Sequence, residues 1–253
     1  MLWLIGTGLC DAQDLSLRAR AAIERADHVY LEGYTSLLRC SHAELEEDLG
    51  RPVTVLVRED VESGIDRVLE QSKTGDVALL VIGDPFGATT HADLLLRARD
   101  AGVEVRVAHN ASVLTAVGVT GLELYRFGHT VSLPYWEPGF EPTSFLPRIA
   151  ENRARGLHTL CLLDIKADRD RFMTVREGLE LLERAQAREP DVKLISPELL
   201  VVGVARLGWP DQLVRAGTLS EMKAVDFGRV PHAIIIPGTL HDVERDLLTG
   251  RRS

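Results

Sequence analysis

Short apolar runs alternate with amphipathic segments along the first half of the chain. Each run is rich in Val, Leu and Ile and is bounded by polar, Gly or Pro residues, which is typical of strands buried on both faces. Between the runs, residues 16–26 and 90–101 carry apolar side chains at helical spacing. Repetition of strand and helix predicts a parallel sheet covered by helices on both faces. The predicted strands are residues 2–5, 29–31, 53–57, 77–82 and 103–107.

The second half of the chain resumes this alternation after a proline-containing segment with one strand, residues 129–145. A helix of small residues, 110–119, opens with residue types that cap helices, and we place a domain boundary near Ala111. The sequence therefore predicts two tandem α/β domains, residues 1–111 and 112–253. In the second domain, the predicted helices are 144–155, 175–187 and 220–225, and the predicted strands are 158–163, 199–205 and 233–236.

Glycines and polar residues gather where the predicted strands end. The segments GTGL, GDPFG, HNASV and DIKA each follow a strand, Arg206 follows another, and His232 precedes the last strand. Ligands in open α/β sheets bind outside the carboxyl ends of the strands. In a two-domain chain, the cleft between domains is a preferred binding place as well. We therefore expect a ligand in the interdomain cleft.

Each of these residues also has a purely structural interpretation. The GTGL loop can be a tight turn, and position 11 is Asp11, so the Gly-x-Gly-x-x-Gly loop that binds nucleotide phosphates is absent. Asp84 and Ser112 can each cap a helix instead of binding a ligand. His91 and His232 are more often satisfied structural histidines than ligands.

The composition limits the class of protein. The 253 residues carry a net charge of -9, from 29 basic and 38 acidic side chains. An acidic surface repels phosphate backbones, so we expect no nucleic acid partner. Apolar runs stay short of the roughly 20 residues that a membrane helix needs, and the first residues, MLWLIGTG, lack a basic leader and a cleavage site. We expect a cytoplasmic protein without a membrane contact.

The spacing of cysteines and histidines gives no metal signal. Cys10, Cys40 and Cys161 form neither a disulfide framework nor a zinc pattern, and no metal site is predicted. A Gly-x-Ser-x-Gly nucleophile motif is also missing from the sequence. Residue patterns alone therefore end at a two-domain α/β protein that binds a ligand in its cleft.

Six segments carry a more specific signal, in this order: LIGTGLCDAQDLSLRA, YLEGYTSLL, VREDVE, GDPFGATTH, HNASVLTAVGVTGLELYRFG and ENRARGLHTLCLLDIKAD. Together they resemble the diphthine synthases, the methyltransferases of diphthamide biosynthesis within the tetrapyrrole-methylase-like group. The resemblance covers nearly the whole chain. It implies two α/β domains of the tetrapyrrole methylase type, S-adenosylmethionine in the cleft between them, and a homodimer. A cofactor site of this type also fits the missing glycine-rich phosphate loop.

The resemblance assigns cofactor contacts to eight positions: Leu9, Asp84, Gly87, Ser112, Val113, Leu163, Ala205 and His232. All eight lie at or beside the strand ends identified above. Most of them would act through backbone groups or packing, which explains their plain side chains. Gly87 departs from the family, which often has a small branched residue there. A backbone contact would survive that change, whereas a packing contact would not.

The implied reaction is methylation of the amino group of a 3-amino-3-carboxypropyl-histidine in translation elongation factor 2, giving diphthine and S-adenosylhomocysteine. The compact length of the chain favours three methyl groups. Asp84 and Asp164 are candidates to receive or orient the amine, and the catalytic group itself stays unknown. Lys166 and Arg206 are candidates to bind the substrate carboxylate, with a solvated surface charge as the alternative. The competing functions are a tetrapyrrole methyltransferase and a non-catalytic module that binds S-adenosylmethionine.

Overall fold

The computed structural model divides the chain into two compact units, each described here by itself. The first unit is Met1–Ala116 with Ala167–Asp170, and the second is Val117–Lys166 with Arg171–Ser253. The domain boundary near Ala111 stays a prediction. The structure describes residues 1–34, 36–57, 65–87 and 91–250. Most of the VREDVE segment, Thr35, the ATT of GDPFGATTH and the start of the predicted helix 90–101 lie outside these residues.

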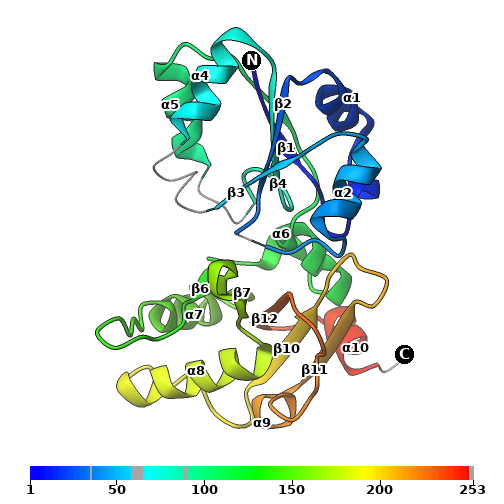
Figure 1. Ribbon diagram of the computed structural model, residues 1–253. Helices are drawn as coiled ribbons and strands as arrows, with labels where there is room; N and C mark the ends of the chain where they lie inside the picture. Colours follow the sequence, from blue (N-terminus) through cyan, green and yellow to red (C-terminus); the bar gives the residue numbers. More distant parts are fainter. Residues whose placement is uncertain (35, 58–64, 88–90, 251–253) are drawn as a thin grey trace. The chain divides into compact units, whose positions relative to one another are not determined.

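The first unit contains a five-stranded parallel sheet with the strand order β3-β2-β4-β1-β5 (Figure 1). This arrangement confirms the parallel sheet predicted from the alternation of strands and helices. Every predicted strand of this unit is present, with ends shifted by one or two residues. The strands are β1 (Leu2–Gly6), β2 (His28–Glu32), β3 (Thr54–Leu56), β4 (Val77–Val81) and β5 (Val105–Ala108).

Helices cover both faces of this sheet. Neighbouring side chains of a strand point to opposite faces, so a strand of apolar residues has apolar side chains on each face that must be covered. Trp3 and Ile5 of β1 pack in one core cluster with residues of α1 and α2, while Leu2 and Leu4 pack with residues of α4 and α5. Figure 1 shows the two helix pairs on opposite sides of the sheet. The helices of this unit are α1 (Leu17–Arg25), α2 (His42–Leu49), α4 (Asp66–Thr74), α5 (Ala92–Asp100) and α6 (Val113–Ala116), with the 3₁₀ helices η1 (Ala12–Asp14) and η4 (Ala167–Arg169).

The second unit is built on a mixed five-stranded sheet with the strand order β11-β10-β12-β7-β6. Strand β12 is antiparallel to both of its neighbours, and β6 is parallel to β7. The sequence predicted three of these strands and the proline-rich segment's single strand, but it gave no signal for β11. The strands are β6 (Val131–Leu133), β7 (Thr159–Leu163), β10 (Leu200–Ala205), β11 (Leu213–Thr218) and β12 (His232–Ile236), and a separate hairpin joins β8 (Ile165–Lys166) to β9 (Arg171–Phe172).

One large core cluster joins this second sheet to its helices. Cys161, Val201 and Ile234 from three strands are fully buried in it, together with Leu146 of α7 and Leu182 of α8. Burial of such a cluster away from water is the main force that holds the unit together. The helices are α7 (Phe145–Ala154), α8 (Val175–Arg188), α9 (Leu219–Met222) and α10 (Asp242–Thr249), with the 3₁₀ helices η2 (Val117–Thr120) and η3 (Leu124–Arg126).

A buried carboxylate attaches the last helix, α10, to the rest of the second unit. Glu244 Oε1 accepts hydrogen bonds from the backbone N–H of Glu123 (3.0 Å) and from His158 Nε2 (3.0 Å). Its Oε2 accepts from an Arg126 guanidinium nitrogen (2.6 Å) and from the backbone N–H of His241 (2.8 Å). Since Glu244 is 1 % exposed, these four donors replace the water that an ionised carboxylate requires.

The hydrogen bonds of His158 fix its protonation state. Its Nδ1 accepts from the backbone N–H of Gly238 (3.0 Å), so the proton is on Nε2, which donates to Glu244. Burial lowers the pKa of His158 and keeps the ring neutral. Burial acts to raise the pKa of Glu244, but hydrogen bonds from Glu123, His241 and His158 outweigh it and leave that pKa below its ordinary value. The pair is therefore a neutral imidazole donating to a carboxylate.

We predict that the free energy of unfolding decreases as the pH falls from 7 towards 4. Unfolded His158 binds a proton that the folded form rejects, and unfolded Glu244 binds one at a higher pH than folded Glu244 does. Both groups therefore favour the unfolded state as protons are added.

The Glu244→Ala variant should lose about 3 kcal/mol of unfolding free energy at pH 7, because the Arg126 charge loses its partner. Urea unfolding at several pH values measures both effects.

The matched control is Glu47→Gln on the exposed side of α2, which should change the unfolding free energy by less than about 0.5 kcal/mol. A Glu244→Ala variant as stable as the parent protein, with the same pH dependence, would contradict the role of this carboxylate.

Candidate functional site

The loop that follows β1 is fixed by backbone pairing and by one carboxylate. Gly8, with a φ of 80°, pairs with Gly83 through two backbone hydrogen bonds of 2.8 and 3.1 Å. Asp14 Oδ2 accepts from the backbone N–H groups of Leu9 (2.9 Å) and Cys10 (2.8 Å). A side chain at Gly8 would collide with Asp14, whose Cβ lies 2.5 Å from the place of the added carbon. The glycine is thus required both by its φ and by its neighbour.

Asp84 lies at the exit of β4 and collects three donors. Its Oδ1 accepts from the backbone N–H of Phe86 (2.9 Å), and its Oδ2 accepts from the backbone N–H of Asn110 (3.0 Å) and from His109 Nδ1 (2.9 Å). Partial burial acts to raise the pKa of Asp84, but these donors outweigh it and hold the pKa below its ordinary value. The carboxylate is therefore ionised at neutral pH, and the residue at the N-cap of the next described helix, α5, is His91.

Asn110 connects this carboxylate to the first loop. Its side-chain Nδ2 donates to the backbone carbonyls of Gly6 (3.1 Å) and Asp14 (2.9 Å). Because the backbone N–H of Asn110 also donates to Asp84, one residue joins the loops that follow β1, β4 and β5. These three strands are neighbours in the sheet order β4-β1-β5, so their carboxyl ends lie at one edge.

Gly87 packs directly against Ser112, at the start of the segment that enters α6. A Cβ on Gly87 would lie 2.5 Å from Ser112 Oγ and 2.8 Å from Ser112 Cβ. The buried Ser112 hydroxyl accepts a 3.3 Å hydrogen bond from the backbone N–H of Leu114. The glycine, where the family often has a branched residue, is therefore matched here by the position of Ser112. The structure brings together five predicted residues at this edge of the first sheet: Leu9, Asp84, Gly87, Ser112 and Val113.

A second group of predicted residues lies at one edge of the second sheet. Ala205, at the end of β10, is paired in register with His232, at the start of β12. Leu163 ends β7 beside the same end of β12, where Leu162 is paired with Ala233. The antiparallel arrangement of β12 thus places the start of one strand beside the ends of two others.

Both ring nitrogens of His232 contact the backbone. Its Nδ1 accepts from the backbone N–H of Val175, and its Nε2 donates to the Arg229 carbonyl. Burial lowers the pKa of His232, so the ring is neutral.

Asp164 and Lys166 follow Leu163 and are both engaged with neighbours. Asp164 Oδ2 accepts from the backbone N–H of Tyr135 (2.8 Å), and Lys166 forms an ion pair with Glu137. Burial raises the pKa of Tyr135 to about 12, so its phenol is protonated at neutral pH. The roles proposed for Asp164 and Lys166 stay predictions.

Arg206 has an unusual backbone and a buried side chain. Its φ of 51° lies in the left-handed region, which is rare outside glycine. The guanidinium donates to the backbone carbonyls of Phe227 (2.7 Å), Arg229 and Asp211 (3.1 Å), and it forms a 3.0 Å ion pair with the Asp211 carboxylate. These contacts fix the chain that leads into β12. A role in binding the substrate carboxylate stays a prediction for this residue.

A buried contact between a carboxylate and an imidazole at the end of β2 was not assigned a role from the sequence. Glu32 Oε2 lies 2.6 Å from His91 Nε2, and His91 Nδ1 lies 3.1 Å from the carbonyl oxygen of Pro85. A carbonyl only accepts hydrogen bonds, so Nδ1 carries a proton and donates it. His91 thus connects the end of β2 to the loop that carries Asp84. In the sequence, Glu32 is an acidic residue at the end of a strand. Its contact becomes evident only together with His91, which lies 59 positions later.

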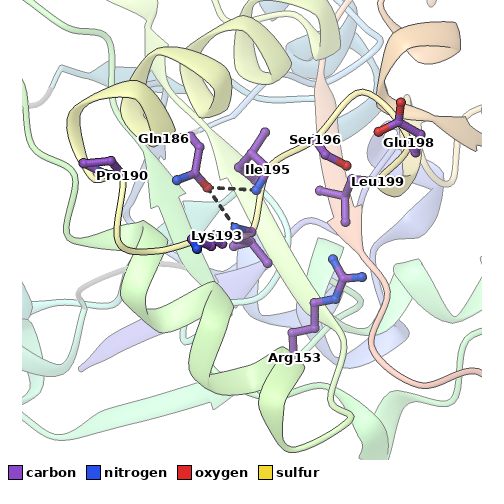
Figure 2. Close-up of a pocket in the computed structure, with 9 residues that line it drawn as sticks. Arg153, Gln186, Pro190, Lys193, Ile195, Ser196, Glu198 and Leu199 are labelled. Carbon is purple, nitrogen blue, oxygen red and sulfur yellow. Dashed lines mark hydrogen bonds between the residues drawn. The ribbon is translucent and has the colours of Figure 1, made fainter.

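A separate hollow of about 840 Å³ lies in the second unit, at the start of β10 and thus at the end of that strand away from Ala205. Figure 2 shows Gln186 fixing its wall: the side-chain oxygen accepts from the backbone N–H groups of Leu194 (3.0 Å) and Ile195 (2.9 Å). Arg153 and Lys193 supply positive charge to the lining. The predicted site residues are not part of this lining, and we assign it no role.

Two further observations concern metals and membranes. Within the described ranges, no group of three or more His, Cys, Asp or Glu side chains is arranged to hold a metal ion. Among the described helices, none is both long and apolar enough to cross a bilayer.

The two five-stranded sheets, each covered by helices, define a two-unit α/β protein. Residues 1–223 match the model of the tetrapyrrole (corrin/porphyrin) methylases, and the chain belongs to this family. It is a methyltransferase, and the fold predicted from the resemblance is confirmed.

Named relatives agree with this family. The chain is 43 % identical to the human diphthine methyl ester synthase, over 98 % of the chain and 94 % of the relative. It is 44 % identical to the Aspergillus fumigatus diphthine methyl ester synthase, over 97 % of the chain and 91 % of the relative. A solved diphthine synthase superposes with a TM-score of 0.89 at 36 % identity, over 99 % of this chain and 95 % of the other.

We predict that Gly87→Ala weakens binding of the cofactor, because the added methyl group displaces Ser112 or the loop that carries Asp84. The double variant Gly87→Ala, Ser112→Gly should restore part of the lost affinity, since it removes the two nearest of the three atoms that the new Cβ would meet. Isothermal titration with S-adenosylhomocysteine measures all four proteins of the cycle.

The Gly102→Ala variant is a poor control because that glycine has a φ of 70°. Leu17→Ala, at a highly exposed position of the same unit, is the better one and should bind normally. Equal affinities for the parent and Gly87→Ala would show that the packing of Gly87 on Ser112 does not affect the site.

Proposed function

We propose that this methyltransferase transfers methyl groups from S-adenosylmethionine to the amino group of the 3-amino-3-carboxypropyl-histidine of translation elongation factor 2. The observation that carries the proposal is the 43 % identity to the human diphthine methyl ester synthase over nearly the full length of both chains. Curated relatives from animals, fungi and an amoeba carry the same name at 40 to 44 % identity. The order of the six quoted segments supports the same substrate.

We propose that S-adenosylmethionine contacts the eight strand-end residues Leu9, Asp84, Gly87, Ser112, Val113, Leu163, Ala205 and His232. Their chemistry fits this cofactor. The ionised Asp84 keeps acceptor capacity for a hydroxyl or ammonium group, while apolar Leu163 and Ala205 suit the flat adenine ring. The bound cofactor would supply a methyl group on a positively charged sulfur.

The substrate nitrogen must present a lone pair to that methyl group. Charge moves from sulfur to nitrogen in the reaction, so little new charge needs stabilisation, and alignment of the two atoms is the main contribution of the protein. Asp164 and Asp84 remain our candidates to orient the amine. Lys166 and Arg206 remain candidates for the substrate carboxylate, although the contacts of Arg206 to three backbone carbonyls favour a structural role.

The names of the relatives support a different number of methyl groups from the one that chain length favoured. The length of the chain favoured trimethylation alone, yet the chain covers 94 % of the human diphthine methyl ester synthase. Length therefore does not separate this chain from enzymes whose name includes a methyl ester. We propose that three methyl groups on nitrogen are followed by a fourth on the substrate carboxylate.

We predict a stepwise gain of methyl masses on elongation factor 2 that bears the unmethylated modified histidine, when it is mixed with the protein and S-adenosylmethionine. Intact-mass spectrometry counts the groups, and four would support the ester. The control is elongation factor 2 without the modification, which should gain none. Methylation of uroporphyrinogen instead of the factor would favour a tetrapyrrole substrate, and cofactor binding without any transfer would favour a binding module.

We also propose that the protein is a homodimer that works in the cytoplasm. The support is the usual assembly of the family it resembles and the place of its proposed substrate in translation. Light scattering coupled to size exclusion should give twice the 27.9 kDa of the chain. A monomer mass at assay concentration would refute the dimer.

A further inference from the structure

His109 and Asp84 form a carboxylate–imidazole pair at the end of β5. His109 Nδ1 lies 2.9 Å from Asp84 Oδ2, and the same oxygen accepts from the backbone N–H of Asn110 at 3.0 Å. Asp84 is 14 % exposed at its side chain, whereas His109 is 69 % exposed. One partner is thus fixed in the loop, and the other extends towards solvent.

The hydrogen bonds define which nitrogen of His109 carries the proton. Asp84 is ionised, so it can only accept, and Nδ1 must be the donor. In the neutral imidazole, Nε2 then has a lone pair, and the exposure of the side chain leaves it accessible. The ring of Phe86 lies beside the imidazole, with 6.0 Å between the ring centroids, and limits its movement on one side. A carboxylate that orients an imidazole in this way is a common arrangement for a base.

The proposed reaction needs such a base at some steps and not at others. An alkylammonium group has no lone pair, so each methylation of nitrogen requires the loss of one proton first. A carboxylate is already ionised at neutral pH and can be methylated on oxygen without losing a proton. The methylations on nitrogen and on oxygen therefore differ in their demand for a proton acceptor, although they use the same methyl donor.

We propose that His109 is a catalytic residue that accepts the proton of the substrate ammonium group at Nε2, while Asp84 orients the ring. The freed lone pair forms the N–C bond as the bond between the methyl carbon and sulfur breaks, and that electron pair stays on sulfur. The proton passes from His109 to solvent before the next cycle. The inference rests on the proposed function, because it assumes an amine substrate.

Other groups at the strand ends suit this task less well. Asp84 already accepts three hydrogen bonds, and its lowered pKa makes it a weak proton acceptor. His232 uses both ring nitrogens for the backbone groups of Val175 and Arg229. Asp84 is the charged group that contacts the His109 ring among the described residues, and the neighbours Asn110 and Ala111 carry no charge.

The test is His109→Asn, since the asparagine amide can replace the donor to Asp84 but offers no nitrogen lone pair. At pH 7, methylation of the unmodified amine should be slowed about 100-fold, the range typical for loss of a general base. The deficit should shrink by about tenfold for each pH unit up to the pKa of the amine, because solvent then removes the proton. Affinity for S-adenosylhomocysteine should stay within about twofold, since the Asp84 contact is kept.

The second substrate is elongation factor 2 that already carries three methyl groups on nitrogen. Its methylation on oxygen should be equally fast in the parent protein and in His109→Asn. The matched control is His28→Asn, an exposed histidine at the start of β2, which should leave both rates unchanged. If the parent protein stops at three methyl groups, the comparison rests on the rate at several pH values and on cofactor affinity.

Two results would overturn the role of His109. An amine methylation rate that is unchanged in His109→Asn excludes it as the base. An equal loss of both methylations together with weaker cofactor binding would show that the residue only positions the cofactor loop. A parent protein that methylates neither form of the factor, although it binds the cofactor, would refute the proposed function itself.

Discussion

The carboxylate of Asp84 is the interaction on which the edge of the first sheet depends. Strands β1, β4 and β5 end side by side, so their loops must hold polar groups close together without the regular pairing of a sheet. Asp84 accepts from two backbone N–H groups and one imidazole, and Asn110 extends the network to the carbonyls of Gly6 and Asp14. Three loops that are far apart in sequence thereby acquire a fixed arrangement.

Buried ionic groups in this protein serve two different purposes. Glu244 and Arg206 have nearly all their hydrogen-bonding atoms occupied by neighbours, so they fix the chain and have little capacity for a ligand. The pair of Asp84 and His109 is different because its second member is exposed and keeps a lone pair on Nε2. Whether a polar cluster is saturated by its own chain thus separates structural clusters from candidates for chemistry.

Strands with continuous apolar runs were predicted well because burial on both faces imposes that pattern on a short segment. The elements that the sequence did not predict lack such a continuous apolar run. Strand β11 lies at an edge of its sheet with half-exposed side chains, and α10 is fixed by Glu244, whose partner Glu123 is 121 residues away. Likewise, the sequence located Asp84 and Ser112 at strand ends but could not reveal His109 and Asn110 as partners of Asp84, because register across the sheet decides those contacts.

The predicted site consists of small or apolar residue types because separate residues position its backbone. When backbone groups contact a ligand, the side chains that matter are those that fix the backbone, here Asp14 for Leu9 and Cys10 and Asn110 for Gly6. The contacting residues themselves must then only be small or apolar enough to leave room, as Gly87 is against Ser112. A substitution at a supporting residue should therefore affect the site as strongly as one at a contacting residue, because both change the position of the same backbone atoms.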